Sequence, residues 1–133
     1  MDLPSPLAML KFAASLLVCL PFIASGIHKL RDFPGAVAEV GSLGLPTPRL
    51  VAAGVIALQL AASGMILGGV LTWLAALALA AFTAAATLLG HRWWRLPPDK
   101  QGEGQQVFLE HCAIVGGLLL LAHIDLSMLR AAP

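Results

Sequence analysis

The chain has 133 residues, of which 59% are hydrophobic and 11% are charged, and its formal net charge is +1. A soluble domain carries roughly 25% charged residues and needs them to cover its surface. A net charge this small gives no electrostatic reason to expect a nucleic-acid partner. The composition therefore excludes an ordinary soluble domain and predicts a single integral membrane domain over residues 1–133, with the lipid bilayer as its main partner.

The first predicted span covers residues 7–27 and is apolar apart from Lys11. A cleaved signal peptide is the alternative, because residues 12–23 resemble the apolar core of such a peptide. Its positively charged leading region is missing, since the chain starts with Asp2 and reaches its first cation only at Lys11. We therefore expect a retained span, kinked at Pro21 and supported by neighbouring helices.

A basic segment follows the first span and contains His28, Lys29 and Arg31. Residues 33–43 then mix apolar residues with one acid and glycines, a pattern typical of a short helix that lies at the membrane interface. The Gly-Leu-Pro-Thr-Pro turn at residues 44–48 leads into the second span, because proline is favoured at the first position of a helix.

The longest uncharged run covers residues 50–90 and holds no Asp, Glu, Lys, Arg or His. As one helix it would be about 60 Å long, twice the thickness of a bilayer core of about 30 Å. Adjacent glycines at Gly68 and Gly69 loosen the helix near the middle of the run. The sequence thus predicts a helical hairpin of two spans, residues 49–69 and 72–91.

Small residues line one face of each helix in this hairpin. In the second span they include a Gly-x-x-x-Gly spacing, which lets another helix backbone approach closely. Gln59 and Ser63 lie on the opposite face, and the face of the third span becomes more polar through Thr83 and Thr87 toward His91. With the fourth span included, the residues expected at helix contacts are Gly54, Gly64, Gly68, Ala76, Ala80, Gly116 and Gly117.

The fourth span has the weakest signal, because the apolar run of residues 112–122 is too short to cross a bilayer. Extension to residues 107–126 gives a sufficient length but brings Glu110 and His111 inside one end. We accept this span because four helices close a bundle. The loop at residues 96–106 is expected to be solvated. The predicted fold is an all-α bundle of four transmembrane helices with a short interfacial helix between the first and second spans.

Cations and aromatic residues at the helix ends indicate the orientation. Six of the eight Lys and Arg residues follow the first or third span, and the other two, Lys11 and Arg130, fall on the opposite side. The positive-inside rule therefore places both termini on the non-cytoplasmic side of a bacterial inner membrane. The residues expected to anchor the bundle at the interface are Lys29, Arg31, Trp73, Trp93 and Trp94.

A candidate polar site lies at one membrane face, where the predicted topology gathers His28, His91, His111 and Glu110. Inserting an ionisable group at the bilayer centre costs about 2.5–3.5 kcal/mol of free energy, and less near the interface. Such residues are therefore candidates for a functional role. Imidazole suits proton transfer, a quinone headgroup or a metal, although interfacial histidines also occur with no such role. No metal is predicted, because no HxxxH or ExxH spacing is present. Gln59 is the one amide near the midplane and more often bridges helices than binds a substrate.

Several motifs recur here in a specific order: Gly26-Ile27-His28-Lys29-Leu30, Gly44-Leu45-Pro46-Thr47-Pro48, the glycine-rich residues 64–69, Ala85-Ala86-Thr87, His91-Arg92-Trp93-Trp94, and Phe108 leading to Gly116-Gly117-Leu118-Leu119. In this order they resemble the DoxX family of small four-helix membrane proteins, from the first span to Ala122. The chain departs from the family pattern at two places. Gln59 stands where many members have Glu, and Glu110-His111 stands where a Lys-Asn pair is common.

This resemblance implies a membrane protein linked to redox processes, with a quinone as the candidate cofactor and a membrane or peripheral redox protein as the partner. We therefore expect a membrane subunit of a quinone-linked oxidoreductase system; if the protein is enzymatic, it acts as part of that system. The alternative is a non-catalytic structural or assembly subunit that packs through its small-residue faces, against other proteins or against copies of itself. A carrier function finds little support, because no inverted repeat is evident.

Overall fold

The computed structural model describes residues 3–131, so residues 1–2 and 132–133 of the predicted domain lie outside the described part. The elements are α1 (Pro6–Arg31), α2 (Phe33–Ser42), α3 (Pro48–Gly68), α4 (Thr72–Gly90), the 3-10 helix η1 (Trp93–Arg95) and α5 (Gln101–Ala131). No strand occurs within the described residues. Four of the helices are long and apolar enough to cross a membrane. The predicted all-α fold, with a short helix between the first two spans, is confirmed.

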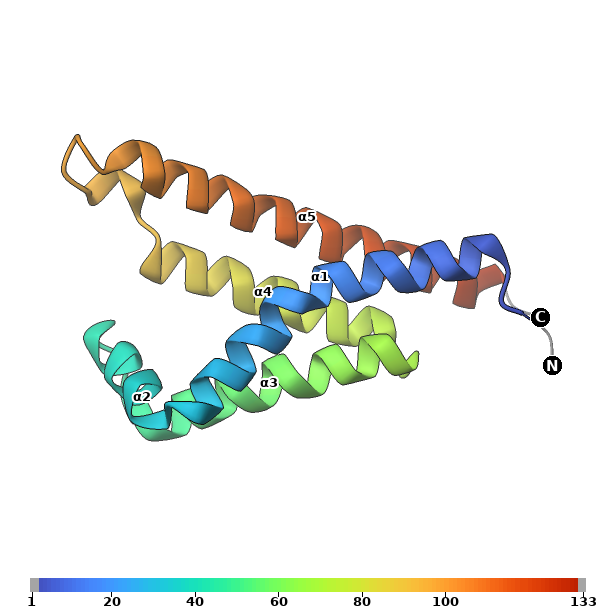
Figure 1. Cartoon of the computed structure of the whole chain (residues 1–133), viewed down its shortest axis with the longest axis horizontal. Coiled ribbons are helices and arrows are strands. Elements are labelled where there is room, and N and C mark those ends of the chain that lie inside the picture. The colour runs from blue at the N-terminus through green and yellow to red at the C-terminus, as the bar shows by residue number, and fades with distance from the viewer. Residues whose placement is uncertain (1–2, 132–133) are drawn as a thin grey trace.

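The four long helices pack in the order α1, α3, α4, α5 (Figure 1). α3 lies between α1 and α4, and α5 runs along α4, whereas no Cα atom of α1 lies within 8 Å of one in α4. α1 meets α5 over a short stretch, and α2 packs on α3. The core between the long helices consists of Cys19, Phe22, Ala62, Ile66, Ala75, Ala76, Leu79, Ala80, Leu118, Leu121 and Ala122. Neighbouring helices are thus closely packed in the series α1, α3, α4, α5, whereas α5 and α1 meet only over a short stretch.

The hairpin between α3 and α4 turns at the expected glycine pair. α3 ends at Gly68, and Gly69 adopts the left-handed conformation with φ 74°. The N–H of Gly69 donates to the carbonyl of Ile66 at 3.2 Å, and the next N–H donates to Met65 at 2.9 Å. Glycine is the residue that pays no steric penalty in this conformation. The predicted break of the apolar run is therefore confirmed, and α4 begins three residues later at Thr72.

α1 extends beyond the predicted span of residues 7–27 and ends at Arg31. The Ser5 hydroxyl caps its start by accepting from the Ala8 N–H at 3.1 Å. Pro21 lies inside the helix, and the ribbon changes direction about midway along α1 (Figure 1). Proline lacks the N–H that would continue the hydrogen-bond ladder, which accounts for the bend.

α5 differs most from its predicted span, residues 107–126. Its 31 residues measure about 46 Å at about 1.5 Å per residue, more than the bilayer core of about 30 Å. The helix begins at Gln101 with a polar segment, and the segment of residues 96–106 that we expected as loop is therefore partly helical. α5 consequently reaches past the end of α4 and carries polar side chains beyond it.

The two faces of α3 have different roles within the chain. Gln59 and Ser63 are buried, with 4% and 1% of their surface exposed. Gly54, Gly64 and Gly68 face outward, and a Cβ atom at any of them would have no described atom within 4 Å. The helices of the chain itself therefore pack on the Gln59 face, and the glycine face is left uncovered.

The other small residues expected at contacts are distributed differently. Ala76 and Ala80 of α4 are buried in the core. Gly117 of α5 faces α1, since a Cβ atom there would lie 3.4 Å from Cγ2 of Val18, whereas the space around Gly116 is open. The α4 stripe is thus an internal packing face.

Candidate functional site

The end of the bundle where α4 leads into α5 is held by aromatic contacts. The ring centroids of Trp93 and Trp94 lie 6.1 Å apart in an edge-to-face arrangement. Trp94 makes a similar contact with Phe108 of α5 at 5.9 Å. A Cβ atom at Gly104 would lie 2.5 Å from Cδ1 of Leu96, so glycine allows the loop to approach α5 closely. These contacts fix the segment after α4 against the first turns of α5.

Two histidines meet at this end. The ring centroids of His91 and His111 lie 4.7 Å apart, with 31° between the ring planes. Nδ1 of His111 lies 2.7 Å from the carbonyl oxygen of Val107. Because a carbonyl only accepts, Nδ1 is the donor in this bond, and Nε2 is then the acceptor of the neutral ring. His91 is exposed and His111 is half-buried, so the pair is accessible from the interface.

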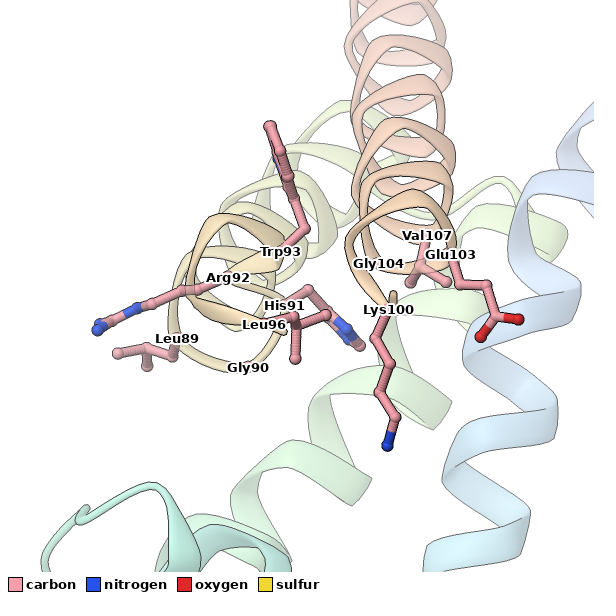
Figure 2. Close-up of a pocket in the computed structure, with 10 residues that line it drawn as sticks. All are labelled: Leu89, Gly90, His91, Arg92, Trp93, Leu96, Lys100, Glu103, Gly104 and Val107. Atoms are coloured by element: carbon pink, nitrogen blue, oxygen red, sulfur yellow. The ribbon is translucent and has the colours of Figure 1, made fainter. Parts of the chain in front are cut away.

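A cavity of about 420 Å³ lies beside His91. Figure 2 shows the imidazole of His91 and the side chains of Lys100 and Glu103 around it, whereas Arg92 extends away. The volume of the cavity falls within the range of roughly 300–1,000 Å³ that is typical of small-molecule sites. The lining residues are Leu89, Gly90, His91, Arg92, Trp93, Leu96, Lys100, Glu103, Gly104 and Val107. The cavity thus combines an apolar wall with an imidazole, cations and one carboxylate.

A separate polar cluster joins α1 to α3. The hydroxyl oxygen of Ser25 accepts from Nε2 of Gln59 at 3.3 Å and also from the ammonium group of Lys29. Oε1 of Gln59 and Oγ of Ser63 are buried and have no hydrogen-bond partner among the described residues. Gln59 therefore bridges two helices, as the midplane amide of a bundle is expected to do.

The structure brings together two of the predicted site residues, His91 and His111. His28 is exposed on α1, whose backbone contacts neither α4 nor η1. Gln59 lies in the α1–α3 cluster, away from the histidine pair. Glu110 is exposed; neither Glu110 nor His111 is among the residues that line the cavity, and His111 adjoins it through its contact with His91. The residues expected to form one site thus lie in separate places, and Gln59 lies near the middle of its helix.

We call the His91–His111 pair and the adjoining cavity the histidine site. Two charged residues of this site are not predicted from the sequence. Lys100 and Glu103 line the cavity, but both fall in the segment that the sequence assigns to a solvated loop. The nearby Gly102 and Gly104 favour that assignment, because glycine weakens a helix. Within residues 3–131, no group of three or more His, Cys, Asp or Glu residues is placed to hold a metal ion.

Comparison with known proteins agrees with this architecture. The four long apolar helices identify the chain as a multi-pass integral membrane protein. The DoxX family model matches residues 10–92, and the chain belongs to the DoxX family. The inner membrane protein YphA of Escherichia coli (strain K12) is 32% identical over 114 residues, which cover 86% of this chain and 81% of that protein. No solved structure shows a significant match. The family match includes His91 but ends before α5, which contributes His111.

Proposed function

We propose that the protein is a membrane subunit of a quinone-linked oxidoreductase system in the bacterial inner membrane, with the His91–His111 pair as its working region. The observation that carries this proposal is the pair of imidazole rings 4.7 Å apart beside a cavity of about 420 Å³. Tryptophans next to the cavity prefer the headgroup level of a bilayer, the depth at which the headgroup of a membrane quinone is accessible. The inner membrane location of the E. coli relative supports the location.

The residues of the site fit a quinone headgroup. Its two carbonyl oxygens accept hydrogen bonds, and its reduction to the quinol takes up two electrons and two protons. Imidazole can donate a hydrogen bond and can exchange a proton near neutral pH. His91 and His111 would orient the headgroup and hold the protons, and Lys100 would hold partial negative charge on the carbonyls. The electrons come from the redox partner protein.

The test is quinone reduction in isolated membranes that contain the protein or its variants, with membranes lacking the protein as the baseline. General acid–base groups contribute roughly 10²–10⁴-fold to a rate, so His91→Ala and His111→Ala should each lower the protein-dependent rate at least tenfold. His28→Ala should leave it unchanged, because His28 lies on α1. His123→Ala is the matched control, since His123 is also on α5 and is exposed. Unchanged rates in both the His91 and His111 variants contradict the proposal.

The second candidate is a non-catalytic structural or assembly subunit, and the uncovered glycine face of α3 favours it. In a bilayer such a face promotes close helix packing, and the chain's own helices leave it open. This candidate predicts that Gly64→Leu and Gly68→Leu abolish co-purification of a stoichiometric partner or a second copy, whereas the histidine variants retain it. Co-purification that survives both glycine variants contradicts it.

The orientation completes the proposal. The end of the bundle with the histidine pair also holds six of the eight Lys and Arg residues: Lys29, Arg31, Arg49, Arg92, Arg95 and Lys100. By the positive-inside rule this end faces the cytoplasm. The histidine site then exchanges protons with the cytoplasm, and both termini lie on the non-cytoplasmic side.

A further inference from the structure

The opposite end of the bundle contains a large apolar groove along the first half of α1. It has a volume of about 1,310 Å³ and lies between α1, the α3–α4 turn and the second half of α5. Figure 1 shows these segments together at the end of the molecule far from η1. The groove exists because α1 contacts α5 over a short stretch and makes no backbone contact with α4. It is therefore separate from the histidine site.

The groove is lined almost entirely by apolar side chains, including Leu10, Val18, Ile114 and Leu120. In an aqueous environment such a surface would be covered by protein, but in a bilayer hydrocarbon chains can fill it. A void left empty would lose the dispersion contacts of its whole lining. The groove is thus suited to a hydrocarbon chain that enters from the surrounding membrane.

Lys11 is the one ionisable side chain among the described residues that line the groove. Its ammonium nitrogen lies 3.6 Å from the thioether sulfur of Met128, and a thioether is only a weak acceptor. The hydroxyl of Ser15 donates to the backbone carbonyl of Lys11 at 2.7 Å, and the described hydrogen bond of the ammonium group is the one to Met128. A cation within a membrane span is costly unless it has a partner of opposite charge. The lining supplies none.

Lys11 lies near one end of the bundle, in the second turn of α1 and beside Met128 near the end of α5. The groove also reaches Gly69 and Thr72 at the turn between α3 and α4, and the ends of membrane spans lie near the headgroup level. Lysine binds phosphate as a compact point charge, and basic residues at the membrane surface attract anionic lipids. The cation and the apolar lining together match one molecule that is anionic at its head and apolar in its chains.

We propose that the groove binds an anionic phospholipid, whose phosphate pairs with the Lys11 ammonium and whose acyl chain lies between α1 and α5. This lipid closes the open side of the bundle. It fills the space that the protein helices leave and neutralises a charge that none of the described lining residues compensates.

The test uses the full-length protein in mild detergent, with equimolar phosphatidylglycerol and phosphatidylcholine of identical acyl chains, and reads the bound lipids by native mass spectrometry. The wild type should bind phosphatidylglycerol preferentially. Lys11→Gln should lower that preference about fivefold, the change that corresponds to about 1 kcal/mol for one lysine at the surface. Lys11→Arg should preserve it, and so should the control Lys29→Gln, a cation at the other end of α1.

A second variant tests the groove itself. Ala113 is exposed and lines the groove, so Ala113→Phe should place a bulky ring in the groove and reduce the binding of both lipids. An unchanged lipid preference in Lys11→Gln overturns the assignment of the phosphate, because the selection of the anionic lipid then does not depend on the Lys11 ammonium group. Unchanged lipid binding in Ala113→Phe overturns the assignment of the groove. A wild type that is dimeric and lipid-free, with a monomeric Ala113→Phe variant, shows that a second copy occupies the groove and also overturns the proposal.

Discussion

Asp125 shows how one carboxylate near the end of a span can serve the architecture. Its Oδ2 atom accepts from the backbone N–H of Trp73 at 3.0 Å. The residue before α4, Leu71, has a left-handed backbone with φ 46° and provides no side-chain cap. A helix leaves its first N–H groups unsatisfied, and its N-terminus favours a negative charge. Asp125 therefore caps α4 from a different helix and joins the end of α5 to the hairpin.

Removal of this cap should destabilise the bundle. We expect Asp125→Ala to lower the free energy of unfolding by about 1–2 kcal/mol, the usual contribution of a capping side chain. Asp125→Asn should lose less, because it keeps an acceptor oxygen. The measurement is thermal or denaturant unfolding in detergent, with His123→Ala as an exposed control on the same helix. Equal stability of the Asp125→Ala and His123→Ala variants would refute the capping role.

Gly26 marks a close approach of α1 to α3. A Cβ atom there would lie 2.7 Å from Cδ2 of Leu60 and 2.8 Å from its Cγ. Gly26→Leu should therefore lower the free energy of unfolding by about 1–3 kcal/mol, as overpacking of a core does. Gly54→Leu is the control, because its surroundings are open and it carries the same gain in helix propensity. The same unfolding assay measures both variants. A Gly26→Leu variant as stable as Gly54→Leu would show that the Leu60 side chain moves aside at no cost in stability.

At the scale of the elements, the sequence predicts the helices well because the controlling signals are local. The absence of charge over residues 50–90, set against the bilayer thickness, requires a hairpin, and the glycine pair fixes its turn at Gly69. The start of α5 is predicted less well. Polar residues with glycines at 102 and 104 are typical of a loop, but the segment is helical from Gln101, and Gly104 lies close to Leu96 and Trp93.

The packing faces are harder to read from the sequence. In lipid the hydrophobic effect does not distinguish an inner from an outer face, so a small-residue stripe marks a contact without identifying the partner. On α4 the stripe with Ala76 and Ala80 packs inside the bundle, whereas on α3 the glycines face outward and Gln59 faces the core. The periodicity places Gln59 opposite the glycines, and the fold decides which of the two faces is covered.

The prediction of the candidate site from the sequence is limited by the same difficulty. Topology tells which residues share an end of the bundle, and it gathers His28, His91 and His111 there. It does not tell the order in which helices surround the core. Because the backbone of α4 lies along α5 and not along α1, His91 meets His111 while His28 lies elsewhere. Only the three-dimensional arrangement supplies this information.

For the molecule as a whole, the proposed orientation in the membrane rests on the distribution of the cations. Lys11 and Arg130 lie at one end, and the other six Lys and Arg residues lie at the opposite end. We expect alkaline phosphatase fused after Pro133 to be active and green fluorescent protein at the same site to be dark, because the proposed orientation puts both termini on the non-cytoplasmic side. Fusions after Pro98, which follows α4, should show the reverse pattern. A fluorescent fusion after Pro133 with an inactive phosphatase there would invert the proposed orientation.

The central claim, that the His91–His111 pair acts on a quinone, is tested most directly by the quinone that co-purifies with the protein. Quinone would be extracted from detergent-purified wild type, from the double variant His91→Ala/His111→Ala, and from the control His123→Ala, and quantified per mole of protein. Two hydrogen bonds of about 1 kcal/mol each predict a loss of roughly thirtyfold in affinity in the double variant and none in the control. The same quinone content in all three proteins would contradict the account.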